Sequence, residues 1–556
     1  MPRRPQPFEF GPWKGARYTT QLPGEKSHAL WARDMMVLDD GTYYRRPSWQ
    51  AIVSAPWSAT SLQALLAFNL VAGGLVVIVV GGQIYATDGS GAPTLRVTTA
   101  NLTTAGITLD ATATVYGCQF GNKLVFNDGI NRPFVWDGTT GAGGLTSLTN
   151  APSKCFGKPT VYYAKLFFIK DVAAAGADRN TFVWSEENQP NTGYEAGGFN
   201  NSWPLVQMGQ GGLYAILGLN DGLYYFRRTS IGVVRGAVTP DFRAAGVHDD
   251  VSLEHGTTSP KGVCYYREHI WFIDETAHPY RLAIGGPLEA LWPETEGLFG
   301  DYSANGFLMS TADVAAAFVC PVPALDKISF WFRDGMIGTS GANRTVLFGL
   351  DGDFESEWSM AGGSGNNNIG AYPTDAIVTP YGPRPGITVY AKDATSASTT
   401  WKQCDLPTQF SSSARFNLPG FPDDPNFFAP KLYVVAGDPR GGPQWRFERV
   451  DAQFVIGENV AAGGTLKASL VTSSQMESFL PGGGSLVGAV AVNLAFAAGR
   501  ISTGRRASWI MQRYGAYCVL AVGEDFNFGA VQNGWGLRGV RVRAFADAPS
   551  ASMASA

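Results

Sequence analysis

A short apolar phrase followed by turn residues recurs along this chain. Its first aliphatic residue falls at positions 84, 124, 166, 223, 270, 328 and 387, so successive copies are 40, 42, 57, 47, 58 and 59 residues apart. The copy at residues 123–129 reads Lys-Leu-Val-Phe-Asn-Asp-Gly. A unit of one strand and one turn cannot bury both of its faces alone, and repetition at this spacing is typical of blades stacked around a ring. The pattern therefore predicts a β-propeller or a similar radial array.

A second extended stretch follows several copies of the phrase. These stretches lie at residues 132–138, 180–185, 231–236 and 345–349. A strand, a Gly/Asp turn and another strand form an antiparallel hairpin, which is the element of one blade. Seven phrases predict six or seven blades within residues 56–410. The uneven spacing predicts loop insertions in some blades, at residues 188–204 and 240–260.

The composition supports an all-β chain. Charged residues make up only 16% of the 556 residues and aromatic residues 12%, while the chain contains 68 glycines and 33 prolines. Few charges together with many glycines and aromatic residues are typical of short strands joined by frequent turns. Long runs of helix-forming residues are almost absent, so we expect strands throughout.

The first 55 residues do not belong to the repeat. Residues 27–37 have helical potential, and the Ser27 hydroxyl could cap the first turn of such a helix. Residues 42–44 favour a strand, which Pro47 would end. We therefore expect residues 1–55 to form an N-terminal extension with a short helix and a strand, which serves as an interface arm.

The residue composition changes after the repeat. Proline, serine and aspartate are frequent at residues 411–429, which predicts a linker. Alternating apolar and polar residues then predict several strands within residues 430–545, as in a β-sandwich packed on or beside the propeller. The small residues at 546–556 predict a flexible tail.

The net charge and the cysteines argue against two classes of site. A formal net charge of −4 at pH 7 does not suit a protein that grips nucleic acid through its phosphates, which needs a dominant basic face. The six cysteines lie far apart without a Cys-x-x-Cys motif or neighbouring histidines. They predict neither a zinc site nor a disulfide framework, and they favour synthesis in a reducing cytoplasm. We expect no cofactor and no bound metal.

One apolar segment, residues 62–80, is long enough to span a membrane. Gln63, Asn69 and the pair Gly73-Gly74 interrupt it. The glycine pair is typical of a turn between two buried strands, so we interpret the segment as a hairpin. The N-terminus has a charged start but no apolar stretch after it, which argues against a secretory signal.

The densest group of ionisable side chains lies in one expected loop. His248 and His255 flank Asp249, Asp250 and Glu254. A metal site or an acid–base site requires such groups to converge in one pocket. Their spacing matches no metalloenzyme motif, so a solvated insertion is the favoured interpretation.

Paired carboxylates would be needed for glycoside hydrolysis. The candidate pairs are Glu186 with Glu187, Asp351 with Asp353, and Glu355 with Glu357. Each pair lies beside Gly, Asn or Ser, where carboxylates commonly accept hydrogen bonds from backbone N–H groups of turns. The Ser-x-Asp-x-Gly-x-x-Trp turn of sialidase propellers does not occur as a series, and motifs for nucleophilic, zinc-dependent or phosphate-binding sites are absent. We expect no catalytic residue and no enzymatic activity.

Several segments have the residue order of a known family. Residues 11–13 read Gly-Pro-Trp, residues 23–24 form a Pro-Gly turn, and residues 40–49 run from Asp-Gly-Thr to Arg-Arg-Pro-Ser-Trp. Residues 126–138 contain Asn-Asp-Gly, then Pro-x-x-Trp-Asp-Gly, and residues 262–284 contain a further similar segment. In these features the chain resembles the tail nozzle, tail hub or tail tubular proteins of short-tailed bacteriophages. The resemblance covers about the first 290 residues and does not extend to the expected sandwich.

The resemblance implies a structural virion protein located in the phage tail. Such proteins form a ring, usually a hexamer, that extends the DNA channel below the portal and its adaptor. They also offer contacts for tail fibres or spikes and seat the plug, and DNA passes through the channel without sequence-specific binding. A neutral or acidic channel lining is expected, since any sequence must pass with low friction. The candidate interface anchors for neighbouring subunits are Trp13, Trp31, Arg45, Arg46 and Trp49.

A second interpretation of the residues remains open. The chain could be a monomeric carbohydrate-binding or glycan-degrading propeller whose aromatic residues line a glycan groove. The mass of the purified protein in solution would distinguish the two interpretations, because a ring protein self-associates and a glycan-binding monomer does not.

Overall fold

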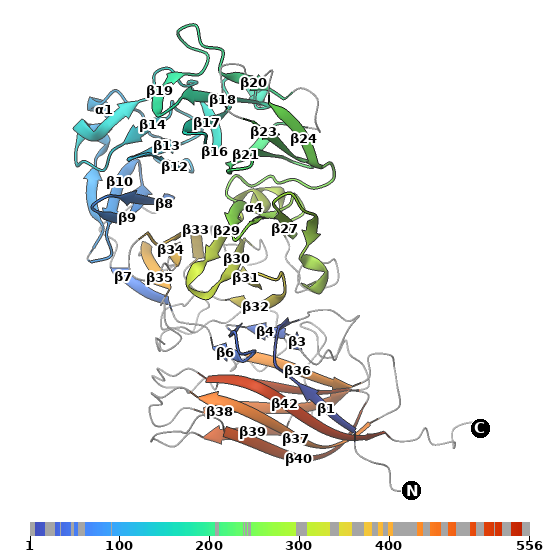
Figure 1. The fold of residues 1–556 in the computed structure, drawn as a ribbon. Helices are drawn as coiled ribbons and strands as arrows, with labels where there is room; N and C mark the ends of the chain where they lie inside the picture. Colours follow the sequence, from blue (N-terminus) through green and yellow to red (C-terminus); the bar gives the residue numbers. More distant parts are fainter. Residues whose placement is uncertain are drawn as a thin grey trace.

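The computed structural model consists of a propeller and a sandwich of two sheets (Figure 1). The N-terminal strands lie with the sandwich, at the side that faces the propeller. The structure describes residues 6–16, 28–29, 31–33, 35–45, 49–53, 62–90, 92–205, 211–236, 238, 242, 246–295, 309–333, 344–358, 372–380, 387–392, 398–403, 431–437, 445–456, 465–473, 490–495, 505–515, 517–524 and 535–546.

Each of the first three blades is an antiparallel sheet whose strands follow one another in the chain. In blade 3 a further strand, β20, pairs with β18. The short helix α1 (Thr99–Thr104) connects blade 1 to blade 2. The strands are β8 (Leu62–Leu70), β9 (Gly73–Val80), β10 (Gln83–Thr87) and β11 (Thr94–Val97), then β12 (Tyr116–Phe120), β13 (Lys123–Asn127), β14 (Phe134–Trp136) and β15 (Leu145–Ser147), then β16 (Cys155–Tyr162), β17 (Lys165–Lys170), β18 (Thr181–Glu186), β19 (Gln189–Gly193) and β20 (Ser202–Pro204).

Blades 4, 5 and 6 repeat this arrangement. Helix α4 (Thr311–Ala316) precedes blade 6, and four single turns of 3₁₀ helix lie in connections: η1 (Ala142–Gly144), η2 (Ala174–Gly176), η3 (Trp292–Thr295) and η4 (Pro323–Leu325). The strands are β21 (Leu213–Gly218), β22 (Leu223–Arg227), β23 (Ile231–Arg235) and β24 (Val247–Ser252), then β25 (Val263–Tyr266), β26 (His269–Ile273), β27 (Pro279–Ala283) and β28 (Leu288–Ala290), then β29 (Phe318–Val322), β30 (Lys327–Phe332), β31 (Arg344–Gly349) and β32 (Phe354–Trp358).

The seventh blade takes its strands from both ends of the propeller. β33 (Tyr372–Val378), β34 (Ile387–Lys392) and β35 (Ser398–Gln403) follow blade 6, whereas the outermost strand β7 (Trp49–Val53) precedes blade 1. The innermost strands contact one another in the order β8, β12, β16, β21, β25, β29 and β33, and β33 contacts β8 again. Within the described residues the ring therefore has seven blades, and backbone hydrogen bonds between β7 and β35 fasten its two ends together. β7 belongs to the propeller and not to the N-terminal extension in which the sequence had placed it.

The recurring phrase marks the second strand in six of these blades. Positions 124, 166, 223, 270, 328 and 387 lie on β13, β17, β22, β26, β30 and β34. Position 84 lies on β10, the third strand of blade 1, because residues 62–80 already supply the first two. The predicted hairpin partners are confirmed as β14, β18, β23 and β31.

Two expectations about connecting segments turn out differently. The predicted insertion at 188–204 contains β19 and β20, and the one at 240–260 contains β24. Both segments therefore supply the outer strands of their blades. Residues 62–80 form the predicted hairpin, in which the glycine pair opens β9. Among the described residues, no helix combines the length and the apolar character needed to cross a membrane.

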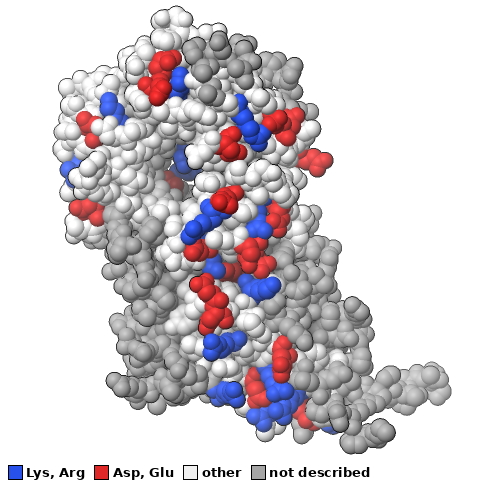
Figure 2. Space-filling view, in the orientation of Figure 1, with Lys and Arg blue, Asp and Glu red and all other residues white. Residues whose placement is uncertain are grey.

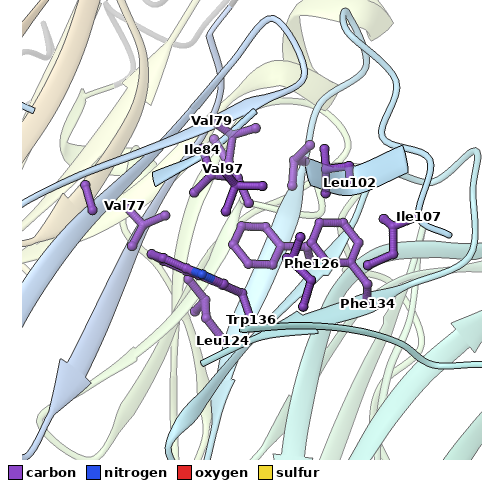
Figure 3. Close-up of a cluster of buried hydrophobic side chains, with 14 of the residues drawn as sticks. Val77, Val79, Ile84, Val97, Leu102, Ile107, Leu124, Phe126, Phe134 and Trp136 are labelled. Carbon is purple, nitrogen blue, oxygen red and sulfur yellow. The ribbon is translucent and has the colours of Figure 1, made fainter. Parts of the chain in front are cut away.

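The propeller core lies between neighbouring blades, as Figure 3 shows for blades 1 and 2. Side chains from β9 and β10 meet those of β13 and β14 there. The rings of Phe126 and Phe134 stack with their centroids 4.9 Å apart, and Trp136 is fully buried. Apolar clusters of the same kind join blades 2 to 3, 3 to 4 and 4 to 5. Each blade thus buries both faces only through its neighbours, which explains the repetition in the sequence.

The first sandwich sheet has the order β40-β37-β42-β6-β5, and β1 also pairs with β42. The two ends of the chain thus share one sheet. On β42, Leu537, Val540 and Val542 are buried while Arg538 and Arg541 are exposed, as expected for a sheet with one face on a core. The strands are β1 (Gln6–Phe10), β5 (Met35–Val37), β6 (Tyr43–Arg45), β37 (Trp445–Ile456), β40 (Arg505–Gly515) and β42 (Trp535–Ala546).

The second sandwich sheet continues directly from blade 6. β32 pairs in parallel with β4, and β4 pairs with β36, so the order runs β32-β4-β36-β41-β38-β39. β38 contacts β40 of the first sheet, which makes the two sheets the layers of a sandwich. The strands are β4 (Trp31–Arg33), β36 (Lys431–Gly437), β38 (Thr465–Ser473), β39 (Val490–Ala495) and β41 (Tyr517–Glu524), with the small parallel pair β2 (Gly15–Ala16) and β3 (His28–Ala29) nearby.

The predicted helix at residues 27–37 is wrong. This stretch contains three short strands, β3, β4 and β5. β4 pairs with β32 and β36, which are more than three hundred residues away. β3 pairs with β2, and β5 pairs with β6, which itself pairs with β42. Tertiary pairing overrides the weak helical propensity of this stretch. The predicted linker at 411–429 lies outside the described residues. So does the predicted tail at 546–556, except for Ala546, which ends β42.

Candidate functional site

Ionisable side chains from several blades meet at the innermost strands. The Lys261 ammonium lies 2.7 Å from the Asp375 carboxylate, which also accepts a hydrogen bond of 2.9 Å from the Leu65 N–H. The Lys261 Nζ atom lies 5.9 Å from the centroid of the Tyr116 ring. We call Lys261, Asp375 and Tyr116 the channel group. Figure 2 shows charged side chains inside the hollow of the propeller.

The channel group links blades that are not adjacent in the chain. Lys261 lies two residues before β25 of blade 5, Asp375 lies on β33 of blade 7, and Tyr116 lies on β12 of blade 2. Burial raises the pKa of Tyr116 to about 12, Asp375 adds to this rise, and Arg179 opposes it. The phenol therefore stays neutral near pH 7, and the lysine and the carboxylate satisfy each other. The group can hold the ring together, and it does not present an activated nucleophile.

Three thiols also lie on innermost strands. Cys118, Cys264 and Cys320 belong to β12, β25 and β29. Burial raises the pKa of Cys118 and of Cys264 to about 12, and it raises the pKa of Cys320 well above the usual value of a thiol, although the Lys158 charge opposes each rise. Because the thiolate is the reactive form, these cysteines are unreactive near neutral pH. They serve as small residues of the inner wall.

An aspartate after the second strand recurs on one face of the propeller. Asp128 accepts hydrogen bonds from the N–H groups of Ile130 and Asn131 within its own turn, and from the Asp110 N–H in the preceding connection. Asp171 occupies the same position in blade 3 and pairs with Lys154 at 3.1 Å. Carboxylates in such turns tie a blade to the connection that enters it. The aspartate of the phrase is therefore a structural residue.

Asp274 has the same role in blade 5. It accepts hydrogen bonds from the Thr276 and His278 N–H groups of its turn. His255 of the preceding connection lies 4.0 Å away from its carboxylate and packs on the Tyr280 ring. All three aspartates are at least nine-tenths buried, so their carboxylates interact with groups of the protein and not with solvent.

A buried carboxylate lies where the propeller meets the N-terminal strands. Glu355 on β32 is only 2% exposed. Its Oε1 atom forms an ion pair with Lys327, and its Oε2 atom accepts a hydrogen bond of 3.1 Å from the Val37 N–H. Burial raises the pKa of Glu355 to about 7, although both partners oppose the rise and Asp351 adds to it.

Further contacts fasten the same junction. The Tyr43 hydroxyl donates a hydrogen bond of 2.8 Å to the backbone oxygen of Glu355. The Trp358 indole donates one of 2.9 Å to the Met35 carbonyl, which the Ser356 hydroxyl also contacts. Neighbouring apolar side chains of blade 6 and of β5 and β6 form one core cluster. Blade 6 and the N-terminal strands therefore form one continuous packed unit.

The predicted interface anchors occupy different places. Trp13 is only 2% exposed, and its indole bonds to Leu537 of β42, so it is a core residue of this chain and not an exposed anchor. Trp31, Arg45 and Trp49 lie on β4, β6 and β7, where their backbones pair with other strands of the same chain. Arg46 lies outside the described residues. The described strands of the N-terminal extension make contacts within the chain, and its role as an interface arm stays a prediction.

The ionisable residues of the predicted loop do not converge. His248 contacts the Tyr225 hydroxyl, and Asp249 pairs with Arg235 along the sheet. His255 belongs to the Asp274 turn instead. Among the described residues, no three His, Cys, Asp or Glu side chains are placed to hold a metal ion.

One member of each candidate carboxylate pair bonds to other groups of the chain, and Asp351 accepts a hydrogen bond of 3.3 Å from the Asp353 N–H. Glu186 contacts Asn201 at 2.7 Å and Lys165 at 3.5 Å. Glu355 and Glu357 lie on β32, where both are buried, because strand β4 covers the edge of this blade. Sequence reasoning placed them in a turn. The alternation Phe-Glu-Ser-Glu-Trp at 354–358 is a strand signal that could have indicated the junction.

Comparisons with known proteins do not assign this chain to a family. No family model and no curated protein matches the sequence. Among solved structures, BBS1N in complex with ARL6DN is similar with 10% identity over 65% of this chain and 98% of that chain, at a TM-score of 0.39. The extracellular domain of the hybrid two-component system BT4673 from B. thetaiotaomicron matches with 10% identity over 70% and 45%, at 0.40. BamB from Moraxella catarrhalis matches with 11% identity over 64% and 97%, at 0.33.

Similarities this weak carry no argument about function. The propeller is established by the chain's own sheets and by the closed ring of its innermost strands.

Proposed function

We propose that this chain is a structural virion protein of a short-tailed bacteriophage and forms the tail nozzle or tail hub ring. In this role it extends the DNA channel below the portal and its adaptor, and it offers attachment for tail fibres or spikes and for the plug. The ring is a homo-oligomer, a hexamer by the resemblance described above. DNA passes through it during ejection without sequence-specific contacts.

The observation that carries the proposal is the place of the residues that resemble this family. Trp13 joins the N-terminal segment to the sandwich through Leu537, and Tyr43 joins the same segment to blade 6 through Glu355. Residues 126–138 form a buried hairpin of blade 2. The N-terminal residues of this set connect the propeller to the sandwich, which suits a subunit that transmits force along a tail.

The use of the charged groups supports a framework function. The channel group, the recurring aspartates and Glu355 all bond to partners within the chain. The carboxylates that a glycan-degrading propeller would require, Glu186 and Glu355, bond to Asn201 and Lys327. The geometry therefore favours the structural function over the carbohydrate-directed one.

The proposal is tested by particles that lack this chain. A nonsense codon in its gene, on a host without a suppressor, should give particles that end at the adaptor and have lost their DNA. A plasmid-borne wild-type copy should restore both the tail and the DNA, and a plasmid that carries the same nonsense codon is the matched control. Mutant particles that keep their DNA and a full-length tail would show that the proposal is wrong.

A further inference from the structure

Two long strands have an outer edge that no other described strand covers. β40, with eleven residues, ends the first sandwich sheet and pairs only with β37. β24, with six residues, is the longest outermost strand of any blade and pairs only with β23. The exposed N–H and C=O groups of such an edge are a template for another strand.

The β40 edge is basic with an apolar centre. Arg506 and Ser508 are exposed, and Ile510 is 84% exposed. The neighbouring strands carry Arg449 and Arg543 beside Ile510 in the register of the sheet, and Asp451 beside Ser508, where it pairs with Arg449 at 2.8 Å. Figure 2 shows basic and acidic side chains together at this end of the sandwich. No proline interrupts β40, so its backbone donors are available along the strand.

The β24 edge has the opposite charge around similar apolar residues. Val247 is 59% exposed and Leu253, directly after the strand, is 64% exposed. Asp250 and Glu254 are exposed beside them. A surface with exposed apolar residues and a charged rim has the anatomy of a protein interface.

The charges decide which pairing is possible. If β40 paired with β40 of another copy, arginines would face arginines, and a β24 pair would bring carboxylates together. Like charges placed opposite each other destabilise a strand pair, whereas opposite charges stabilise it. Pairing of two β40 edges or of two β24 edges is therefore disfavoured, and pairing of β24 with β40 is favoured.

We propose that β24 of one copy pairs with β40 of the next copy, so that the chain assembles head to tail. The two edges lie at opposite ends of the molecule (Figure 1), so they cannot pair within one copy. A contact between two different surfaces of identical subunits generates a ring when the rotation closes and a filament when it does not. As the subunit contact of a ring, this inference rests on the function proposed above.

The direct test uses two complementary variants. R506E/I510E makes β40 acidic, and D250K/E254K makes β24 basic. Each variant alone should lose self-association by about tenfold or more, because R506E/I510E places carboxylates opposite the acidic β24 edge and D250K/E254K places lysines opposite the basic β40 edge. A mixture of the two should recover association in alternating order and beyond a dimer, because the intact β24 of R506E/I510E pairs with the intact β40 of D250K/E254K and the two altered edges are also opposite in charge. Sedimentation velocity at low salt measures all three.

A chain that carries all four substitutions tests the charge pairing itself. Its two edges have exchanged signs, so it should associate with itself again. Lys14→Glu and Glu187→Lys change exposed charges away from both edges and should leave association unchanged. High salt should weaken the wild-type contact, since exposed charges are screened over about 10 Å at 0.1 M.

The outcomes separate this contact from the proposed function. A wild-type chain that stays monomeric at the highest attainable concentration, or variants that associate like the wild type, would overturn the β24–β40 contact. Neither result bears on whether particles without the protein lose their tail. Mutant particles with intact tails would refute the function and leave a demonstrated contact standing.

Discussion

The Trp13 indole donates a hydrogen bond of 2.9 Å to the Leu537 carbonyl, 524 positions further along the chain. Trp13 also packs near the Tyr43 ring, with centroids 5.7 Å apart. One side chain thus fixes the N-terminal segment to the last strand of the sandwich, while Tyr43 binds blade 6. The two termini and the propeller therefore depend on each other for stability.

We expect Trp13→Phe to lower the free energy of unfolding of the sandwich by about 1–2 kcal/mol, because it leaves the buried Leu537 carbonyl without its donor. Trp13→Ala should cost about 3–5 kcal/mol, since it also opens a cavity. Urea denaturation followed by fluorescence and circular dichroism measures both. The exposed neighbour Lys14→Ala is the control and should change little. Equal stability of the Phe variant and the wild type would show that the hydrogen bond does not contribute.

Glu355 should make the stability of the junction depend on pH. Its pKa rises from 4.5 to about 7 on folding, so between these pH values the folded chain keeps a proton that the unfolded chain has lost. The free energy of unfolding therefore falls as pH rises through this window, and the loss is complete above pH 7. The shift corresponds to about 3 kcal/mol at most.

The variant Glu355→Gln removes this dependence. The difference in the free energy of unfolding between Glu355→Gln and the wild type should increase from pH 4.5 to pH 7 in favour of the variant. The absolute difference in unfolding free energy also includes the loss of the ion pair with Lys327. The informative quantity is therefore the change of this difference with pH, not its size at one pH. Glu187→Gln, on an exposed turn, is the control. Parallel pH curves for Glu355→Gln and the wild type would contradict the expected titration.

The sequence predicted the propeller because its signal is local. Each phrase such as 123–127 combines alternating burial with a turn, and the neighbouring blade repeats the same pattern. The hairpins therefore follow from short stretches of sequence. Position 84 differs from the other copies only in its place within the blade. It lies on the third strand, because the two strands before it also contain long apolar runs.

The junction could not be predicted in this way because its partners are distant in sequence. Residues 27–37 contain alanine, leucine and methionine, which favour a helix, and pairing with β2, β32, β36 and β6 makes them strands. The same holds for Lys261 and Asp375, which are 114 positions apart. The sequence around Lys261 does not indicate Asp375 as its partner, and the sequence around Asp375 does not indicate Lys261. Sites built from such long-range pairs require the structure.

The pair of Lys261 and Asp375 should show a coupling energy of about 1–3 kcal/mol in a double-mutant cycle with Lys261→Met and Asp375→Asn. Each single change leaves one charge poorly compensated among the inner strands, and the double change removes both. The exposed pair Arg267 and Asp326 is the matched control, with an expected coupling below about 1 kcal/mol. Unfolding free energies of the four proteins in each cycle give the couplings. Additive effects at the inner pair would mean that it does not hold the blades.

Gly74 should be essential for closing the ring. A Cβ atom at this position would lie 2.1 Å from the carbonyl oxygen of Pro380, which follows the innermost strand of blade 7. Because the obstacle is backbone, Gly74→Ala must push blades 1 and 7 apart, at an expected cost of about 1–3 kcal/mol.

The matched control for this change is Gly143→Ala in blade 2, where an added Cβ meets no atom within 4 Å. It should change the unfolding free energy by less than about 1 kcal/mol, and it can raise it by restricting the unfolded chain. Limited proteolysis should cut Gly74→Ala first in the hairpin of β8 and β9, since separation at the blade 1–blade 7 seam exposes it. If Gly74→Ala unfolds and is cleaved like Gly143→Ala, then the approach of Pro380 does not constrain the ring, and closure depends on the β7–β35 pairing alone.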